Sequence, residues 1–213
     1  MKDYRNTKYC KEFYNIKQKK DELNKLILKE HPRVTNMYNK VNSNKQDSYK
    51  NNFMSIYNYK CSYCGCSIAI ISKKEFEIDH FISTKPKNNS LNNLVLACYD
   101  CNRGKKDFLI PPKYEDKLNP DKEYIHDIFY RDNLYYIKIN KEYKYDEIIT
   151  TLFDKLDFNN ISKRLDYLLL NLIGLEKQVK EKIHKNKECK NLKEIHRKLL
   201  EALEELRETR NFL

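Results

Sequence analysis

The chain is poor in the residues that make fibrous or low-complexity sequences. Its 213 residues include only 3 glycines, 5 prolines and no tryptophan, whereas 40% are hydrophobic. This composition excludes a collagen-like chain and a flexible linker, and the sequence contains no internal repeat with a period of about 20 to 50 residues. The length suits one folded domain, or a small core with helical extensions.

Long apolar runs are also missing. No stretch approaches the roughly 20 apolar residues that span a bilayer. The N-terminus, MKDYRNTKYCKEFYN, lacks the apolar segment of a signal peptide. We therefore expect a cytoplasmic protein with no membrane partner. In that compartment the seven cysteines are not expected to form a disulfide framework.

Four of the cysteines are instead paired by their spacing. Cys61 and Cys64 form one Cys-x-x-Cys, and Cys98 and Cys101 form a second, with 33 residues between the pairs. Two such pairs can complete a tetrahedral Zn²⁺ site, whereas a thioredoxin-type redox motif needs only one. The spacing therefore predicts structural zinc. Outside the pattern are Cys10, Cys66 and Cys189. Cys66 is close enough to be a substitute ligand, but we interpret it as an ordinary thiol.

The formal net charge of +11 is unevenly distributed. Residues 1–50 carry 13 basic and 6 acidic side chains, whereas residues 111–160 carry 8 basic and 11 acidic ones. Four ionised thiolates and one Zn²⁺ would leave a net charge of about +9. This excess is consistent with a polyanionic partner such as nucleic acid, although a lysine-rich surface also improves solubility.

Hydrophobic spacing divides the chain into three predicted regions. Residues 1–50 form a predicted basic, helical N-terminal arm. In its segment DELNKLILKEH the apolar residues recur at helical spacing, and Pro32 ends the run. VNSNKQDSYKNN, residues 41–52, is a polar connection. Residues 51–110 form a block in which FEIDHFI predicts a strand and LNNLVLACYDCNRGKK is helix-like. Two strands and a helix fit the length of this block.

Residues 111–213 begin with a strand or hairpin and end with helices. EYIHDIFYRDNLYYIKI alternates apolar residues around Arg131-Asp132-Asn133. Apolar residues from Ile161 to Ile183, and again from Leu192 to Leu206, recur with a period near 3.6 and predict two amphipathic helices. These helices either pack on the core or form a docking region for a partner. The predicted fold class is α+β.

Between the cysteine pairs lie residues suited to catalysis. Asp79 and His80 are adjacent on a predicted strand, so their side chains point to opposite faces unless the strand ends there. A carboxylate can hold Mg²⁺ while a histidine activates water. Asn102 directly follows Cys101, so zinc would fix its direction, and an amide oxygen is a suitable ligand for a hard ion. Taken singly, each of these residues is more often structural.

In combination, FEIDHFI, SLNNL and CYDCNRGKK closely resemble the HNH endonucleases of the ββα-metal, or His-Me, finger class. The resemblance covers about 50 of the 213 residues. It departs from the family pattern at Asn102, where histidine is common, and at Ser83, where proline is frequent. Asn88-Asn89 replaces a frequent glycine pair, but asparagine tolerates positive φ. The signature positions present are Cys61, Cys64, Asp79, His80, Asn93, Leu94, Cys98, Cys101, Asn102 and Lys105.

The resemblance implies a central ββα-metal finger, stabilised by a four-cysteine zinc site and flanked by the N-terminal helical arm and the C-terminal helical region. It implies that His80 is the general base and that Asp79 and Asn102 hold a catalytic Mg²⁺ or Mn²⁺. Asn93 would hold the loop that orients His80. The residues that could neutralise flanking phosphates are Arg103, Lys105 and Lys106.

The implied activity is hydrolysis of phosphodiester bonds in nucleic acid, with DNA as the expected substrate. The flanks resemble, less specifically, stand-alone HNH proteins of bacterial anti-phage systems, such as the Septu and retron-associated nucleases that work with an ATPase. The oligomeric state stays open. The alternative is a zinc-stabilised nucleic-acid-binding or docking subunit without activity of its own, which would have no need of Asp79, His80 and Asn102 together.

Overall fold

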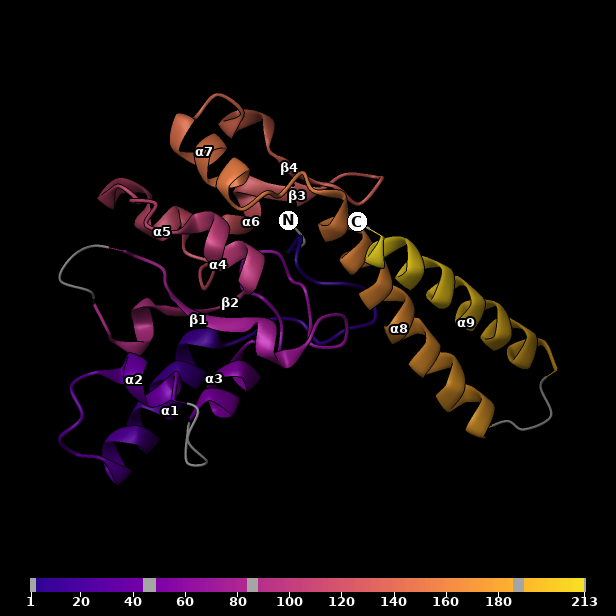
Figure 1. Cartoon of the computed structure of the whole chain (residues 1–213), viewed down its shortest axis with the longest axis horizontal. Helices are drawn as coiled ribbons and strands as arrows, with labels where there is room; N and C mark the ends of the chain where they lie inside the picture. Colours follow the sequence, from indigo (N-terminus) through magenta and orange to yellow (C-terminus); the bar gives the residue numbers. More distant parts are fainter. Residues whose placement is uncertain (1–2, 44–48, 84–87, 186–189, 213) are drawn as a thin grey trace.

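The computed structural model describes residues 3–43, 49–83, 88–185 and 190–212 (Figure 1). At its centre are two antiparallel strands, β1 (Phe76–His80) and β2 (Leu94–Cys98), followed directly by helix α4 (Tyr99–Lys105). The expected ββα arrangement is therefore present. One detail differs, because LVLAC was expected in a helix. Its five residues are all buried and pair with β1, and a short apolar run of this kind suits a strand or a helix equally well.

Three N-terminal helices lie on the other side of the β1–β2 hairpin from α4 (Figure 1). The longest is α1, whose apolar residues Leu23 and Ile27 are buried as the helical spacing predicts. The middle of the predicted polar connection, residues 44–48, lies outside the described residues, and its last residues begin the third helix. These helices are α1 (Ile16–Glu30), α2 (Met37–Val41) and α3 (Lys50–Ile56).

The N-terminal segment is part of the same hydrophobic core as the finger and the residues after it. Its cations are partly structural. Arg5 is buried, and its Nη1 donates hydrogen bonds to Ser62 O (2.5 Å) and Pro120 O (2.7 Å). Lys20 is buried too, and its Nζ donates to Leu94 O (2.5 Å) and pairs with Asp121. These two positive charges therefore hold the fold together and do not face solvent.

After the finger, a second small hairpin lies above α4 in Figure 1. Strands β3 (Phe129–Arg131) and β4 (Ile137–Ile139) confirm the hairpin expected around residues 131–133. Helix α7 (Glu147–Lys155) was not anticipated. It packs closely on α4, because a Cβ added at Gly104 would lie 2.1 Å from Lys155 O. The short helices of this region are α5 (Glu115–Leu118) and α6 (Ile125–Ile128), and the 3₁₀ turns of the chain are Lys73–Glu75, Leu91–Asn93, Pro112–Tyr114 and Lys141–Tyr143.

The last two helices, α8 (Ile161–Lys185) and α9 (Lys190–Asn211), confirm the two amphipathic helices expected at the C-terminus. They lie side by side and extend away from the rest of the molecule (Figure 1). Leu165 and Leu169 of α8 and Leu203 of α9 are buried. Among the described residues, no helix has the length and apolar character needed to cross a bilayer. Helices combined with two small sheets make an α+β fold, as expected.

Candidate metal centre and active site

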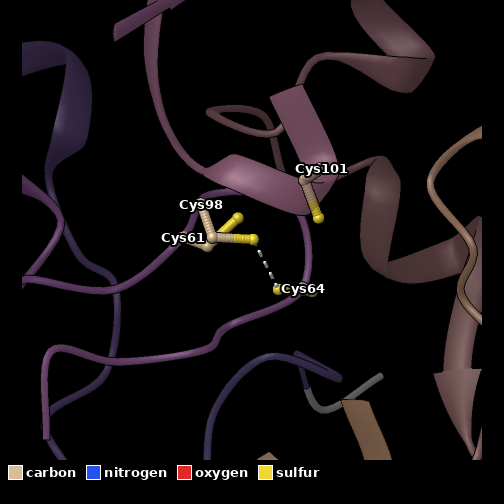
Figure 2. A group of neighbouring side chains, drawn as sticks. All are labelled: Cys61, Cys64, Cys98 and Cys101. Carbon is tan, nitrogen blue, oxygen red and sulfur yellow. Dashed lines mark hydrogen bonds between the residues drawn. The ribbon is translucent and has the colours of Figure 1, made fainter. Parts of the chain in front are cut away.

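The four paired cysteines converge at the end of the β1–β2 hairpin (Figure 2). All four are buried, and their Sγ atoms lie within 4.8 Å of one another. The Sγ atoms of Cys64 and Cys98 are 3.8 Å apart. Tetrahedral Zn²⁺ with Zn–S bonds of about 2.3 Å would separate its sulfur ligands by about 3.8 Å, so the cluster fits a zinc ion. The members of the cluster are Cys61, Cys64, Cys98 and Cys101.

A tight backbone turn positions the first cysteine pair, Cys61 and Cys64, in the four-cysteine cluster. Cys61 N donates to Cys66 O (2.8 Å), and Gly65 N donates back to Cys61 O (2.9 Å). Gly65 has φ +81°, and a Cβ there would lie 2.6 Å from Arg5 O, so the turn requires glycine. Cys66 lies outside the cluster, and burial raises the pKa of its thiol, with Asp166 adding to the effect. Cys10 also lies outside the cluster, and Cys189 is outside the described residues.

Asp79 is held in the interior by two partners that the resemblance did not assign to it. Its Oδ2 accepts a hydrogen bond from Tyr63 OH at 2.6 Å and lies 3.1 Å from Lys105 Nζ. Burial raises the pKa of the Asp79 carboxyl, while Lys105 opposes that shift. Lys105 is itself 0% exposed and also donates to His80 O at 2.9 Å. The structure thus places Lys105 against Asp79, where the resemblance had placed it among the phosphate contacts.

His80 ends β1 and contacts different elements from Asp79. Its Nε2 lies 2.8 Å from Asn89 Oδ1, and its ring centroid is 4.6 Å from that of Tyr38 in α2. Because Oδ1 of the Asn89 amide can only accept, a neutral His80 ring that makes this contact carries its proton on Nε2 and presents Nδ1 as an acceptor. An unprotonated ring nitrogen is what a general base needs. The side chain is 8% exposed.

Asn93 holds the loop between the two strands. Its Oδ1 accepts from Ile82 N (2.9 Å), and its Nδ2 donates to Ile82 O (3.1 Å) and Asn88 O (2.9 Å). Asn93 O also accepts from Phe81 N (2.8 Å). These bonds join the residues immediately after His80 to those around Asn89, the two ends of the loop that orients the imidazole.

Asn102 faces a polar pocket of about 650 Å³ between α4 and the N-terminal helices. Its Nδ2 donates to Glu77 Oε2, and Arg103 Nη2 lies 3.1 Å from Glu77 Oε1. Asn102 therefore contacts Glu77, whereas Asp79 contacts Lys105. The pocket is lined by Tyr38, Asn42, Lys50, Lys74, Phe76, Glu77, Ile78, Asn102 and Arg103.

Three residues of this region were missed at the level of the sequence. Tyr38 comes from α2, far from the finger in sequence, and no motif in that segment indicates a functional role for it. Asn89 was noted only as a replacement for a turn glycine. Glu77 could have been found, because in a strand it shares a face with Asp79, two residues later, and lies on the face toward α4.

Comparison with known families agrees with this geometry. Residues 61–108 match the family model of the HNH endonucleases. The matched segment starts at Cys61 and ends just after α4, so it contains the four-cysteine cluster, His80 and Asn102. No curated protein and no solved structure matches the chain. Residues 61–108 are therefore similar to the HNH endonucleases, a family whose members use metal ions and act on nucleic acid.

The cluster predicts one zinc ion per chain. Cys61→Ser removes one of the four ligands and should lose both the metal and the cooperative thermal transition, because structural zinc contributes folding free energy directly. The matched control is Cys66→Ser, which changes a buried thiol outside the cluster and should keep one zinc ion per chain. Elemental analysis with thermal unfolding checks both variants. Folded wild-type protein without zinc would contradict the assignment.

The Asp79–Lys105 pair predicts a large difference between two neighbouring lysines. Lys105→Met leaves a buried carboxylate alone and should lower the free energy of unfolding by roughly 3–5 kcal/mol at neutral pH. Because the pKa of Asp79 is already raised by burial, the loss should shrink as the pH falls and the carboxyl is protonated. Lys106→Met, at an exposed position, should change little. Urea denaturation at two pH values measures both variants, and equal effects would refute the buried-pair interpretation.

Proposed function

We propose that the chain is a metal-dependent endonuclease that hydrolyses phosphodiester bonds of nucleic acid, with DNA as the expected substrate. The observation that carries this proposal is the position of His80. It ends β1 inside the segment that matches the HNH family, and its ring contacts that of Tyr38, which also lines the pocket beside Asn102. A histidine with an available ring nitrogen therefore lies beside a polar, basic pocket.

In this proposal His80 is the general base. It accepts a proton at Nδ1 from the water that attacks the scissile phosphorus, while the hydrogen bond from Nε2 to Asn89 keeps the ring oriented. Asn93 holds the same loop through its hydrogen bonds to Ile82 and Asn88. Removing Asn93 would therefore disturb the orientation of His80 and not the proton transfer itself.

The donors near the pocket fit a hard divalent ion, because they are an amide oxygen on Asn102 and carboxylates on Asp79 and Glu77. Mg²⁺ or Mn²⁺, when bound, would stabilise negative charge on the phosphate and on the leaving oxygen. Asp79 is the ligand implied by the family pattern, and Lys105 must release it before it can serve. Glu77 is the carboxylate that already contacts Asn102.

Phosphate contacts are assigned to the cations that solvent can reach. The Arg103 side chain is 60% exposed, and Lys106 is exposed as well. Lys50 and Lys74 line the pocket beside Asn102. These two lysines replace the buried Lys105 in the expected set of phosphate-binding residues. Such contacts position a nucleic acid without reading its sequence.

The activity is tested by a plasmid-cleavage assay with Mg²⁺ and one matched pair of histidine variants. His80→Ala should lower the cleavage rate by roughly 10²-fold or more, as expected for loss of a general base, while zinc content stays at one ion per chain. His184→Ala, at an exposed position near the end of α8, should cleave like wild type. If His80→Ala also cleaves like wild type, the alternative of an inactive nucleic-acid-binding or docking subunit replaces this proposal.

The same assay distinguishes base from metal ligands. Asn102→Ala should recover part of its rate at high Mg²⁺ or with Mn²⁺, because more metal compensates for weaker binding. The same recovery is expected for Asp79→Asn or Glu77→Gln, depending on which of the two carboxylates is a metal ligand. His80→Ala should not recover, since added metal cannot supply the missing base. The isosteric changes at the two carboxylates keep the side-chain volume.

A wider role follows only from the resemblance of the flanks, and we propose it on that basis: an effector nuclease that acts with an ATPase in anti-phage defence. The paired helices α8 and α9, which extend from the core (Figure 1), are the proposed docking region for that partner. A phage challenge of cells that carry the native locus should show protection that His80→Ala abolishes. Equal plaque counts with and without the locus would reject the defence role.

A further inference from the structure

The hairpin of β3 and β4 has an unusual surface for a segment outside the finger. Residues 129–145 contain 5 of the 17 tyrosines of the chain, together with four basic and two acidic side chains. The surrounding residues 111–160 are net acidic, so the positive charge is concentrated at the hairpin. Cations lie over its rings: Lys138 Nζ is 5.3 Å from the Tyr136 ring centroid, and Lys144 Nζ is 5.7 Å from that of Tyr145. Interleaved tyrosines and lysines are typical of surfaces that bind single-stranded nucleic acid.

A pocket of about 540 Å³ lies against this hairpin. Its volume is within the range of roughly 300–1,000 Å³ that is usual for small-ligand sites. One part of its wall is a pair of stacked rings, Tyr135 and Tyr167, with centroids 5.7 Å apart and an interplanar angle of 27°. The lining residues are Asp3, Tyr4, Asn6, Tyr130, Arg131, Asp132, Tyr135, Asn140, Lys141 and Tyr167.

The stacked rings rest on a fixed cation. The Arg131 guanidinium carbon lies 4.1 Å from the Tyr167 ring centroid. Arg131 donates from Nε to Tyr4 O (2.8 Å) and from Nη1 to Tyr135 O (2.6 Å), and its Nη2 reaches Cys64 O (3.5 Å). Burial lowers the pKa of Arg131 to about 10, which leaves it protonated at neutral pH. Because one of these carbonyls belongs to a cluster cysteine, the pocket is tied directly to the metal centre.

Tyr135 occupies a backbone conformation that its side chain does not favour. Its φ is +68°, a region that costs a bulky residue roughly 1–2 kcal/mol and that glycine or asparagine occupies more easily. The turn is held there by Asp132, whose Oδ1 accepts from Leu134 N and Tyr136 N, both at 2.9 Å. The ring is nevertheless 41% exposed. A strained, exposed aromatic residue kept at a pocket wall is better explained by a ligand than by folding.

We propose that this pocket binds an unpaired nucleobase of the substrate, which stacks on Tyr135 while the surrounding lysines contact its flanking phosphates. This proposal rests on the proposed function, because it identifies the class of nucleic acid that the nuclease engages. A flat aromatic wall beside carboxylate and amide groups suits a heteroaromatic base, which offers a π-face for stacking and polar edges for hydrogen bonds. A duplex keeps its bases stacked on one another and cannot offer one to the pocket without unpairing. The protein should therefore prefer single-stranded, frayed or bulged nucleic acid.

The test uses a single-stranded oligothymidylate that contains one 2-aminopurine, a base whose fluorescence is quenched by stacking. The chain has no tryptophan, so the probe can be observed with little protein background. Binding is measured with the full-length zinc-loaded protein and without added Mg²⁺, so that no cleavage interferes. Wild type should quench the probe and bind it more tightly than the matched duplex.

Three substitutions make the test specific to the pocket. Tyr135→Ala should weaken binding of the single strand by about 5- to 150-fold, the loss expected for one stacking contact, and should abolish the quench. Tyr135→Phe keeps the aromatic face and should behave like wild type. Tyr124→Ala changes a tyrosine that is 59% exposed, lies outside residues 129–145 and does not line the pocket, so it should keep the quench. Zinc content and thermal unfolding confirm that each variant is folded.

The outcomes separate this inference from the proposed function. If plasmid cleavage depends on His80 but wild type neither quenches the probe nor prefers the single strand, the pocket inference fails and the nuclease stands. If the quench depends on Tyr135 but no cleavage occurs, the pocket stands in a protein that only binds nucleic acid. Equal losses in Tyr135→Ala and Tyr124→Ala would overturn the inference in favour of diffuse surface binding.

Discussion

The finger depends on four thiolates that meet at one point. Its secondary structure is small, with two strands of five residues and a helix of seven, and a lone hairpin of that size is marginal in water. Cys61 and Cys64 precede β1, whereas Cys98 and Cys101 join β2 to α4, so a metal held by both pairs fixes the connection at each end. Since Asn102 follows Cys101 directly, a zinc ion held by the cluster would also fix where Asn102 points.

Several positive charges that composition assigns to the surface are instead part of the interior. Arg5, Lys20 and Lys105 are each buried, and each is bonded to carbonyl oxygens and to a carboxylate. Such cations are tolerated in the interior because hydrogen bonds and an opposite charge compensate for their desolvation. The net charge of +11 therefore overstates the positive surface that remains for a phosphate backbone. The exposed and pocket-lining cations, and not the total, indicate where nucleic acid would lie.

The sequence predicted what depends on local spacing. The two Cys-x-x-Cys pairs, the helix around Leu23 and Ile27, the β3–β4 hairpin and the two C-terminal helices all follow from patterns within a short stretch. The strand at LVLAC was missed because a fully buried strand shows no alternation. Lys105 was misplaced because its role depends on Asp79, 26 residues earlier. Tyr38 could not be found, since only tertiary packing brings α2 against His80.

The alternation of side chains along β1 explains why the two carboxylates face α4 while His80 faces α2. Glu77 and Asp79 share one face, and α4 lies along it, with Asn102 against Glu77 and Lys105 against Asp79. Side chains three residues apart on a helix lie on neighbouring turns, so one face of α4 serves both carboxylates. His80 points the other way, toward α2. A metal on Asp79 must then displace a buried ammonium that stabilises the fold, whereas a metal on Glu77 need displace only an amide hydrogen bond and an exposed arginine. Metal binding at Asp79 would therefore cost the fold more than binding at Glu77, although both carboxylates contact α4.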